Sequence, residues 1–210
     1  MFVEVNLLDF SLIALLIVFV VKGRKNGLFL ELVHIGGFFV ALVSSLRLLP
    51  SSSKWIYQII ELAPHISVIT GFALTFSIIL LLYQFIVAFI LKNSKVQIEE
   101  WVNRLGGTLL GLLKGLNVCS LLCLMILLFP VSKTVVEAKD ASFAFRYAKN
   151  IMPAVYSVVK RVVPGSPHFE TVVDDTFLGF DLSELDPYSK KFLQEFGSER
   201  AKEISASTYQ

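Results

Sequence analysis

Four long runs of apolar residues, separated by short polar segments, divide the first 130 positions of the chain. The runs cover about residues 6–21, 28–49, 65–91 and 105–129. A helix needs about 20 predominantly apolar residues to cross the hydrocarbon core of a bilayer. We therefore expect an all-α protein in which residues 1–130 form a four-span transmembrane helical bundle. Gly23–Gly27 is expected to be a tight polar turn, and Pro50 is expected to end the second span.

The rest of the chain, residues 131–210, is more polar and is expected to form a C-terminal extramembrane tail. An apolar stripe at helical spacing predicts an amphipathic helix at about 150–163. A short helix is expected at about 187–203, where proline follows a capping aspartate. Between them, Asp174 and Asp175 belong to an expected acidic, solvated loop. The amphipathic helix is expected either on the membrane surface or packed against the bundle or a second copy of the chain.

The fourth run carries small residues at strict intervals of four: Gly107, Gly111, Gly115, Cys119 and Cys123. On a helix this spacing places them along one edge. Close backbone packing at such GxxxG-type edges holds membrane helices together, because lipid gives no hydrophobic drive for helix association. Gly37 and Gly71 are further candidate packing positions. Ser67, Gly71 and Thr75 repeat the spacing, so the third span is the expected partner of the fourth.

Composition and charge support a membrane protein. Of the 210 residues, 55% are hydrophobic and 17% are charged, whereas ordinary domains carry about 25% charged residues. A net charge of +2 gives no reason to expect a nucleic-acid partner. The two cysteines lie within an apolar helix and are interpreted as packing residues.

The distribution of cations predicts the orientation in the membrane. With the N-terminus outside, six cations would be cytoplasmic and four would lie on the outer side: Lys22, Arg24, Lys25, Lys92, Lys95 and Arg104 against Arg47, Lys54, Lys133 and Lys139. The positive-inside rule therefore places the N-terminus and the C-terminal tail on the outer side.

Four ionisable residues lie within the expected spans: Asp9, Glu31, His34 and Lys114. Charges inside a membrane are costly and usually face the bundle and pair with one another. Glu31 and Lys114 are a possible intramembrane ion pair, and Asp9 and His34 a possible polar cluster. Two alternatives stay open, namely that Lys114 reaches the headgroups without a partner or that these groups line a proton or ion path.

Known catalytic signatures are not found in the sequence. There is no Walker loop, no G-x-S-x-G, no H-E-x-x-H and no cysteine-pair zinc spacing. Glu31-x-x-His34 matches one part of a di-iron bundle motif, but such a site needs a second copy and two further glutamates. We therefore predict no catalytic residue, no cofactor and no metal, and a protein that is not an enzyme.

The chain resembles the colicin V production protein (CvpA) family over about residues 6–130. The matching residues are Asn6-x-x-Asp9, Gly23-x-x-x-Gly27, Glu31, Gly37 and the run Arg104, Gly107, Gly111, Lys114 and Gly115. The family typically has aspartate where this chain has Asn103, and more often arginine where it has Lys114. The resemblance implies a four-helix inner-membrane domain needed for colicin V production or export and for envelope upkeep.

We therefore interpret the chain as a non-enzymatic accessory or scaffold protein in envelope homeostasis and in toxin or bacteriocin production or secretion. The expected partners are the lipid bilayer and either a second copy of the chain or other membrane proteins. The alternative is a subunit of a small oligomeric channel or transporter that uses Asp9, Glu31, His34 and Lys114.

Overall fold

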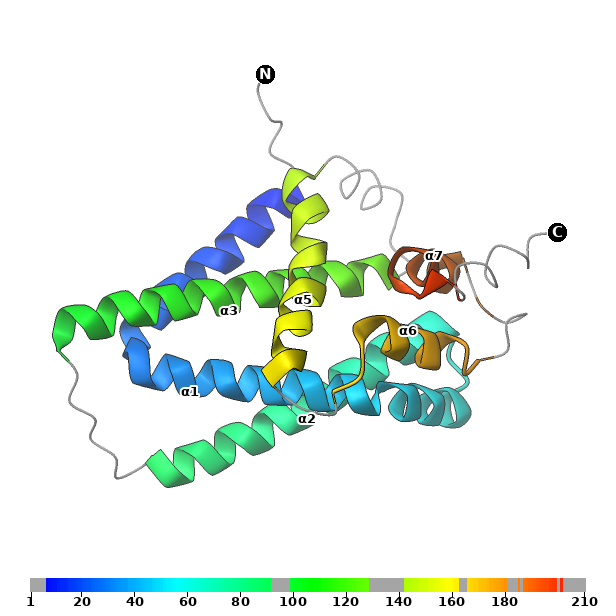
Figure 1. Cartoon of the computed structure of the whole chain (residues 1–210), viewed down its shortest axis with the longest axis horizontal. Coiled ribbons are helices and arrows are strands. Elements are labelled where there is room, and N and C mark those ends of the chain that lie inside the picture. The colour runs from blue at the N-terminus through cyan, green and yellow to red at the C-terminus, as the bar shows by residue number, and fades with distance from the viewer. Residues whose placement is uncertain are drawn as a thin grey trace, which may run out of the picture. The chain divides into compact units, whose positions relative to one another are not determined.

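The structure is a computed structural model and describes residues 7–91, 99–128, 142–162, 166–180, 185, 187–199 and 201. Every regular element in these residues is an α-helix (Figure 1), which confirms the all-α prediction for them. In chain order the helices are α1 (Leu7–Ile60), α2 (Pro64–Leu91), α3 (Glu100–Leu128), α5 (Phe143–Val162), α6 (Phe169–Phe177) and α7 (Pro187–Phe196).

Helix α1 contains both of the first two apolar runs. Its 54 residues are interrupted at Gly27, where φ is 79° and ψ is 169°, so α1 has two arms. We call residues 7–26 the first arm and residues 28–60 the second arm; Figure 1 shows the change of direction between them. At about 1.5 Å per residue α1 would be about 80 Å long if straight, well beyond a core of about 30 Å. The turn expected over Gly23–Gly27 is therefore confined to Gly27.

Pro50 does not end the helix as predicted, because α1 continues through it to Ile60. A proline inside a helix removes one backbone hydrogen bond and crowds the preceding turn. Two serines that follow it bond back across the proline: Ser53 Oγ donates to the Leu49 carbonyl over 2.6 Å and Ser52 Oγ to the same carbonyl over 3.3 Å. These hydroxyl contacts bridge the turn that contains Pro50.

Within the described residues, three helices are long and apolar enough to cross a membrane, namely α1, α2 and α3. Helix α2 begins one residue before the expected third span and ends at the same residue, Leu91. Helix α3 begins at Glu100, five residues before the expected start of the fourth span, and position 129 lies outside the described residues. The four apolar runs thus occupy three helices.

The C-terminal part differs most from expectation. Helix α5 starts at Phe143, well before the expected position 150, and Pro153 lies inside it. Helix α6 was not predicted, and Asp174 and Asp175 belong to this helix and not to a loop. The last expected helix begins at Pro187 as predicted and ends earlier, at Phe196.

The described residues group into two compact units that cut across the expected division at position 130. The first unit takes those within 1–39, 81–124 and 131–155, and the second takes those within 40–80, 125–130 and 156–210. The core of the first unit includes Ile35, Phe38, Cys119, Leu121, Phe145, Ala148 and Met152. The core of the second includes Leu42, Leu46, Val68, Phe72, Val172, Phe177, Phe192 and Leu193. Each unit therefore contains residues of both the apolar and the polar part of the sequence.

In the second unit, aromatic rings connect α5, α6 and α7 with one another, and a ring just after α6 contacts α1. The rings of Tyr57 and Phe180 lie 5.3 Å apart, and those of Phe177 and Phe192 lie 5.7 Å apart. The hydroxyl of Tyr156 donates to the Pro167 carbonyl over 3.1 Å. Burial raises the pKa of Tyr156, so this hydroxyl stays protonated and remains a donor at neutral pH.

Candidate functional site

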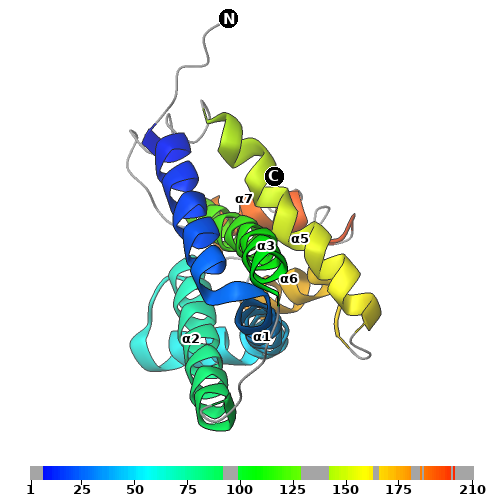
Figure 2. The same ribbon diagram turned by 90° about the vertical axis from the view of Figure 1, so that its left-hand side faces the viewer.

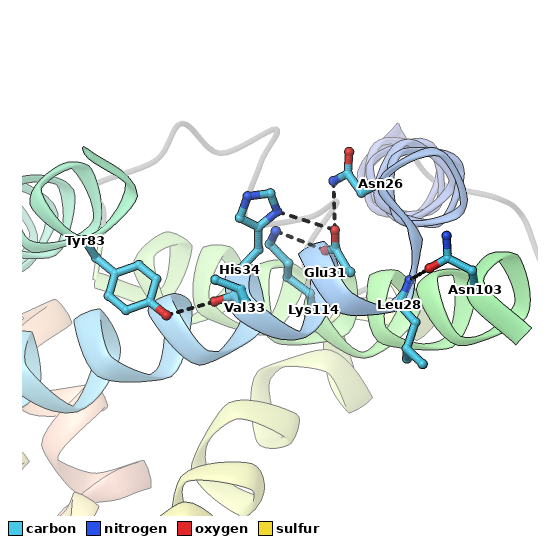
Figure 3. A network of polar contacts seen from close by, with 8 residues as sticks. All are labelled: Asn26, Leu28, Glu31, Val33, His34, Tyr83, Asn103 and Lys114. Carbon is cyan, nitrogen blue, oxygen red and sulfur yellow. Dashed lines mark hydrogen bonds and ion pairs between the residues drawn. The ribbon is translucent and has the colours of Figure 1, made fainter. Parts of the chain in front are cut away.

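The break in α1 at Gly27 is fixed by a side chain from α3. A Cβ atom at Gly27 would collide with the Asn103 side chain, and the positive φ already disfavours any other residue. The Leu28 N–H, which begins the second arm, donates to Asn103 Oδ1 over 2.7 Å (Figure 3). Asn103 therefore supplies from another helix the kind of acceptor that an N-cap residue supplies within its own helix.

The first arm of α1 runs along the small-residue edge of α3 (Figure 2). A Cβ atom at Gly111 would lie 2.5 Å from the Phe19 carbonyl oxygen, and one at Gly107 would lie 2.9 Å from the Gly27 carbonyl carbon. A Cβ atom at Gly23 would lie 2.8 Å from Gly111 Cα. The backbones of the two helices are thus in direct contact. We call Gly23, Gly107, Gly111 and Gly115 the glycine seam.

The remaining positions of the small-residue row continue this contact. A Cβ atom at Gly115 would lie 3.0 Å from Leu16 Cδ1 and from Phe19 Cβ. The thiol of Cys119 donates to the Leu12 carbonyl over 3.6 Å. The order of these contacts shows that the first arm and α3 run in opposite directions. The partner of the row is therefore the first arm of α1, whereas the sequence pointed to the third span.

The other two candidate packing glycines meet different neighbours. A Cβ atom at Gly37 would collide with the ring of Tyr83, whose hydroxyl donates to the Val33 carbonyl over 3.1 Å (Figure 3). In the second unit, a Cβ atom at Gly71 would lie 3.0 Å from the backbone nitrogen of Ser53. Both glycines thus allow close approach between α1 and α2.

A group of polar side chains lies around the break, and we call Asn26, Glu31, His34 and Lys114 the polar cluster (Figure 3). Lys114 Nζ lies 3.1 Å from Glu31 Oε1, and Asn26 Nδ2 donates to Glu31 Oε2 over 2.9 Å. His34 Nδ1 lies 3.7 Å from Glu31 Oε2. Glu31 is only 1% exposed, so its charge is balanced by these neighbours and not by water.

Lys114 reaches the carboxylate from α3 across the first arm. Its Nζ lies 5.8 Å from the centre of the Phe19 ring, within the range of a cation–π contact. Its side chain is 15% exposed, whereas that of His34 is 27% exposed. His34 is thus the member of the cluster that is most open to the surroundings, and Glu31 is the most enclosed.

Asp9 belongs to a different site, and the structure does not group it with His34. Its carboxylate accepts hydrogen bonds from the Ser142 hydroxyl and from the Ala144 N–H, the latter over 3.0 Å. Ser142 Oγ in turn accepts from the Phe145 N–H over 3.0 Å. Together Asp9 and Ser142 cap the N-terminus of α5, where a negative charge also interacts favourably with the helix dipole.

A second contact holds α5 against α3. Pro153 interrupts the hydrogen bonding of α5, and the N–H of the preceding residue, Met152, donates to Ser120 Oγ over 2.7 Å. Ser120 and Met152 are both buried. These contacts were not predicted, although a serine directly before an apolar helical pattern is a known start signal and marks Ser142.

The contacts that the described residues make at this site are hydrogen bonds and charge pairs. No group of three or more His, Cys, Asp or Glu side chains that could hold a metal ion occurs in the described part of the chain. Cys119 and Cys123 are buried and are not joined in a disulfide. Glu31 and His34 are adjacent, but no further carboxylate of the described residues joins them.

Comparisons with known proteins point to one family. The model of a family described as colicin V production protein matches residues 8–153 of this chain, which is more than half of its length. The match extends through the first half of α5, beyond the end at about 130 expected from the sequence. Comparisons with curated proteins and with solved structures gave no match.

Proposed function

Because the chain belongs to the colicin V production protein family, we propose that it is a non-enzymatic accessory or scaffold protein of the bacterial inner membrane. In this role it supports toxin or bacteriocin production or secretion and envelope homeostasis. The observation that carries the proposal is the glycine seam, where the backbones of α1 and α3 touch without any side chain between them. Close backbone packing of this kind holds membrane helices together and builds a structural framework.

The proposed topology has four spans, with the two arms of α1 crossing the membrane separately, followed by α2 and α3. The N-terminus and the C-terminal tail are proposed to be periplasmic. Two features of the first unit support a common side for both. The first arm and α3 are antiparallel, so the start of α1 and the end of α3 lie at the same end. Asp9 also binds the start of α5.

The test compares two substitutions in cells. Gly111→Leu is expected to prevent assembly, because even a Cβ atom there would lie 2.5 Å from a backbone oxygen. Glu31→Gln keeps an acceptor for Lys114 and is expected to leave both membrane level and function nearly unchanged. The readouts are the amount of membrane-inserted protein, colicin V-type toxin secretion and detergent sensitivity of the cells. A working Gly111→Leu protein at normal level would contradict the proposal.

A second candidate function is a subunit of a small oligomeric channel or transporter. The observation that favours it is the polar cluster, because ionisable groups within a membrane often mark proton or ion paths. This alternative no longer includes Asp9 among the residues of the path, because its contacts are with Ser142 and with the start of α5. The alternative expects Glu31→Gln to abolish function at a normal membrane level, so the same pair of variants separates the two proposals.

A further inference from the structure

We propose that the end of the first unit around Gly27 is a binding surface for the headgroups of anionic phospholipids. The inference rests on the proposed membrane placement and adds a partner to it. The residues that carry it are Lys22, Arg24 and Lys25, which we call the basic triplet. All three are exposed and lie directly before the break in α1.

The basic triplet has no acidic partner in the part of the chain that the structure describes. The carboxylate nearest in sequence, Glu31, is buried and is paired with Lys114. Arg104, near the start of the neighbouring helix α3, is paired with Glu100 one turn away. Among the described residues at this end, Glu99 is the acid that remains, so the three cations outnumber it and this end carries a positive charge that internal contacts do not neutralise.

The same end carries the other features of a membrane–water boundary. Asn103 contacts Gly27, so Trp101, two residues earlier in α3, lies at the level of the break. Trp101 is 60% exposed, and tryptophan is enriched at the headgroup level of membranes. Exposed apolar residues follow the cations and the tryptophan on both helices, with Leu32 on α1 and Leu105 on α3. A phospholipid matches this order, because its phosphate meets cations and its acyl chain meets leucine.

The surface is rigid. The glycine seam fixes the first arm against α3, and the hydrogen bond from the Leu28 N–H to Asn103 fixes the break. These contacts hold the backbone of the basic triplet near that of Trp101, which lowers the entropy cost of bringing the two together on one lipid. Cations near an anionic surface each contribute about 1 kcal/mol of attraction, or about fivefold in affinity. Three of them are enough to enrich anionic lipid here over neutral lipid.

The test uses the two tryptophans of the chain as local reporters. Full-length Trp55→Phe protein, in which Trp101 is the only tryptophan, is reconstituted into dioleoylphosphatidylcholine vesicles. These contain an equal minor fraction of either dibrominated phosphatidylglycerol or dibrominated phosphatidylcholine. Bromine quenches tryptophan on contact, so the ratio of quenching reports lipid preference at Trp101. We expect the anionic lipid to quench at least about threefold more effectively.

Two variants and one salt titration decide the outcome. Lys22→Gln/Arg24→Gln/Lys25→Gln is expected to abolish the preference. Arg146→Gln/Lys160→Gln/Arg161→Gln, which removes the same charge from α5, is expected to keep it. In the parent, about 1 M salt reduces the Debye length to about 3 Å and should reduce the preference without any mutation.

The experiment separates a failure of the lipid-binding inference from a failure of the proposed membrane placement. Protein that does not enter the vesicles would contradict the membrane placement itself. Inserted protein with equal quenching by both lipids, or with a preference that survives the loss of the basic triplet or high salt, would overturn the lipid-binding surface alone.

Discussion

The glycine seam and the polar cluster join the same two helices by opposite means. At the glycine seam, α1 and α3 touch through backbone atoms, and the contact depends on the absence of side chains. At the polar cluster, the two helices are connected by the long side chains of Lys114 and Glu31, whose charges balance each other. The first contact fails when atoms are added, and the second fails when Lys114 loses both the counter-charge and the hydrogen-bond acceptor that Glu31 provides. The comparison teaches that the glycine seam sets the distance between α1 and α3. This distance in turn brings Lys114 within reach of Glu31.

The largest expected effect comes from leaving one charge of the polar cluster without its partner. Glu31→Leu buries Lys114 without a counter-charge and should lower the free energy of unfolding by about 3 kcal/mol. Glu31→Leu/Lys114→Met should recover most of this loss, because a neutral apolar pair carries no desolvation cost. The measurement is reversible unfolding in detergent micelles. If the double variant were as unstable as the single one, hydrogen bonding and not charge would dominate the cluster.

The next effect tests the glycine seam with the smallest possible addition. Gly111→Ala places a methyl group against the Phe19 carbonyl and should destabilise the protein by about 1–3 kcal/mol. The matched control is Gly36→Ala, where a Cβ atom would lie 3.7 Å from the Tyr83 hydroxyl, an ordinary contact. The control gains helix propensity and should be neutral or up to about 1 kcal/mol more stable. Thermal unfolding of both variants measures the difference, and equal shifts would refute the steric account.

A smaller effect is expected at Asp9, a charge that is satisfied by a hydroxyl group and a backbone N–H and not by a cation. Asp9→Ala removes the cap of α5 and should cost about 1–2 kcal/mol, felt mainly at the start of that helix. Asp9→Asn keeps an acceptor and should cost less. Hydrogen exchange at Ala144 and Phe145 is the local readout. Unchanged protection in the alanine variant would mean that the carboxylate does not hold α5.

The smallest effect is expected at Asn103, where the break in α1 meets α3. Asn103→Ala leaves the Leu28 N–H without its acceptor and should cost about 1 kcal/mol. Asn103→Asp supplies the same oxygen and should be close to the parent in stability. Thermal unfolding again gives the measurement, and an aspartate variant as unstable as the alanine variant would show that the carboxamide nitrogen is also needed.

Much of the fold follows from the sequence, but the partners do not. The spacing of Gly107, Gly111 and Gly115 marks a packing edge, yet it carries no information on which helix fills that edge. The sequence favoured the third span because Gly71 has the same spacing, whereas the structure places Ser53 against Gly71. Periodicity is a local property, and helix pairing depends on the whole arrangement.

The polar residues show the same limit. Glu31 and Lys114 could be related from the sequence because helix rise gives the depth of each below a common loop. Asp9 could not be placed in this way, because its partners follow 133 and 135 positions later. The composition changes at Pro130, which made the tail look separate. The contacts of Asp9 and Ser120 with α5 instead tie the first part of that tail to the apolar helices.

The single-residue break at Gly27 has a consequence for changes in chain length. In an α-helix each residue turns the chain by about 100°, so one inserted residue after Gly27 would rotate the whole second arm by that angle. Glu31 would then point away from Lys114, and the Val33 carbonyl would leave Tyr83. The position of α1 relative to α2 and α3 is thus set by one residue at the break. We expect the insertion or deletion of a residue there to disrupt both of these contacts.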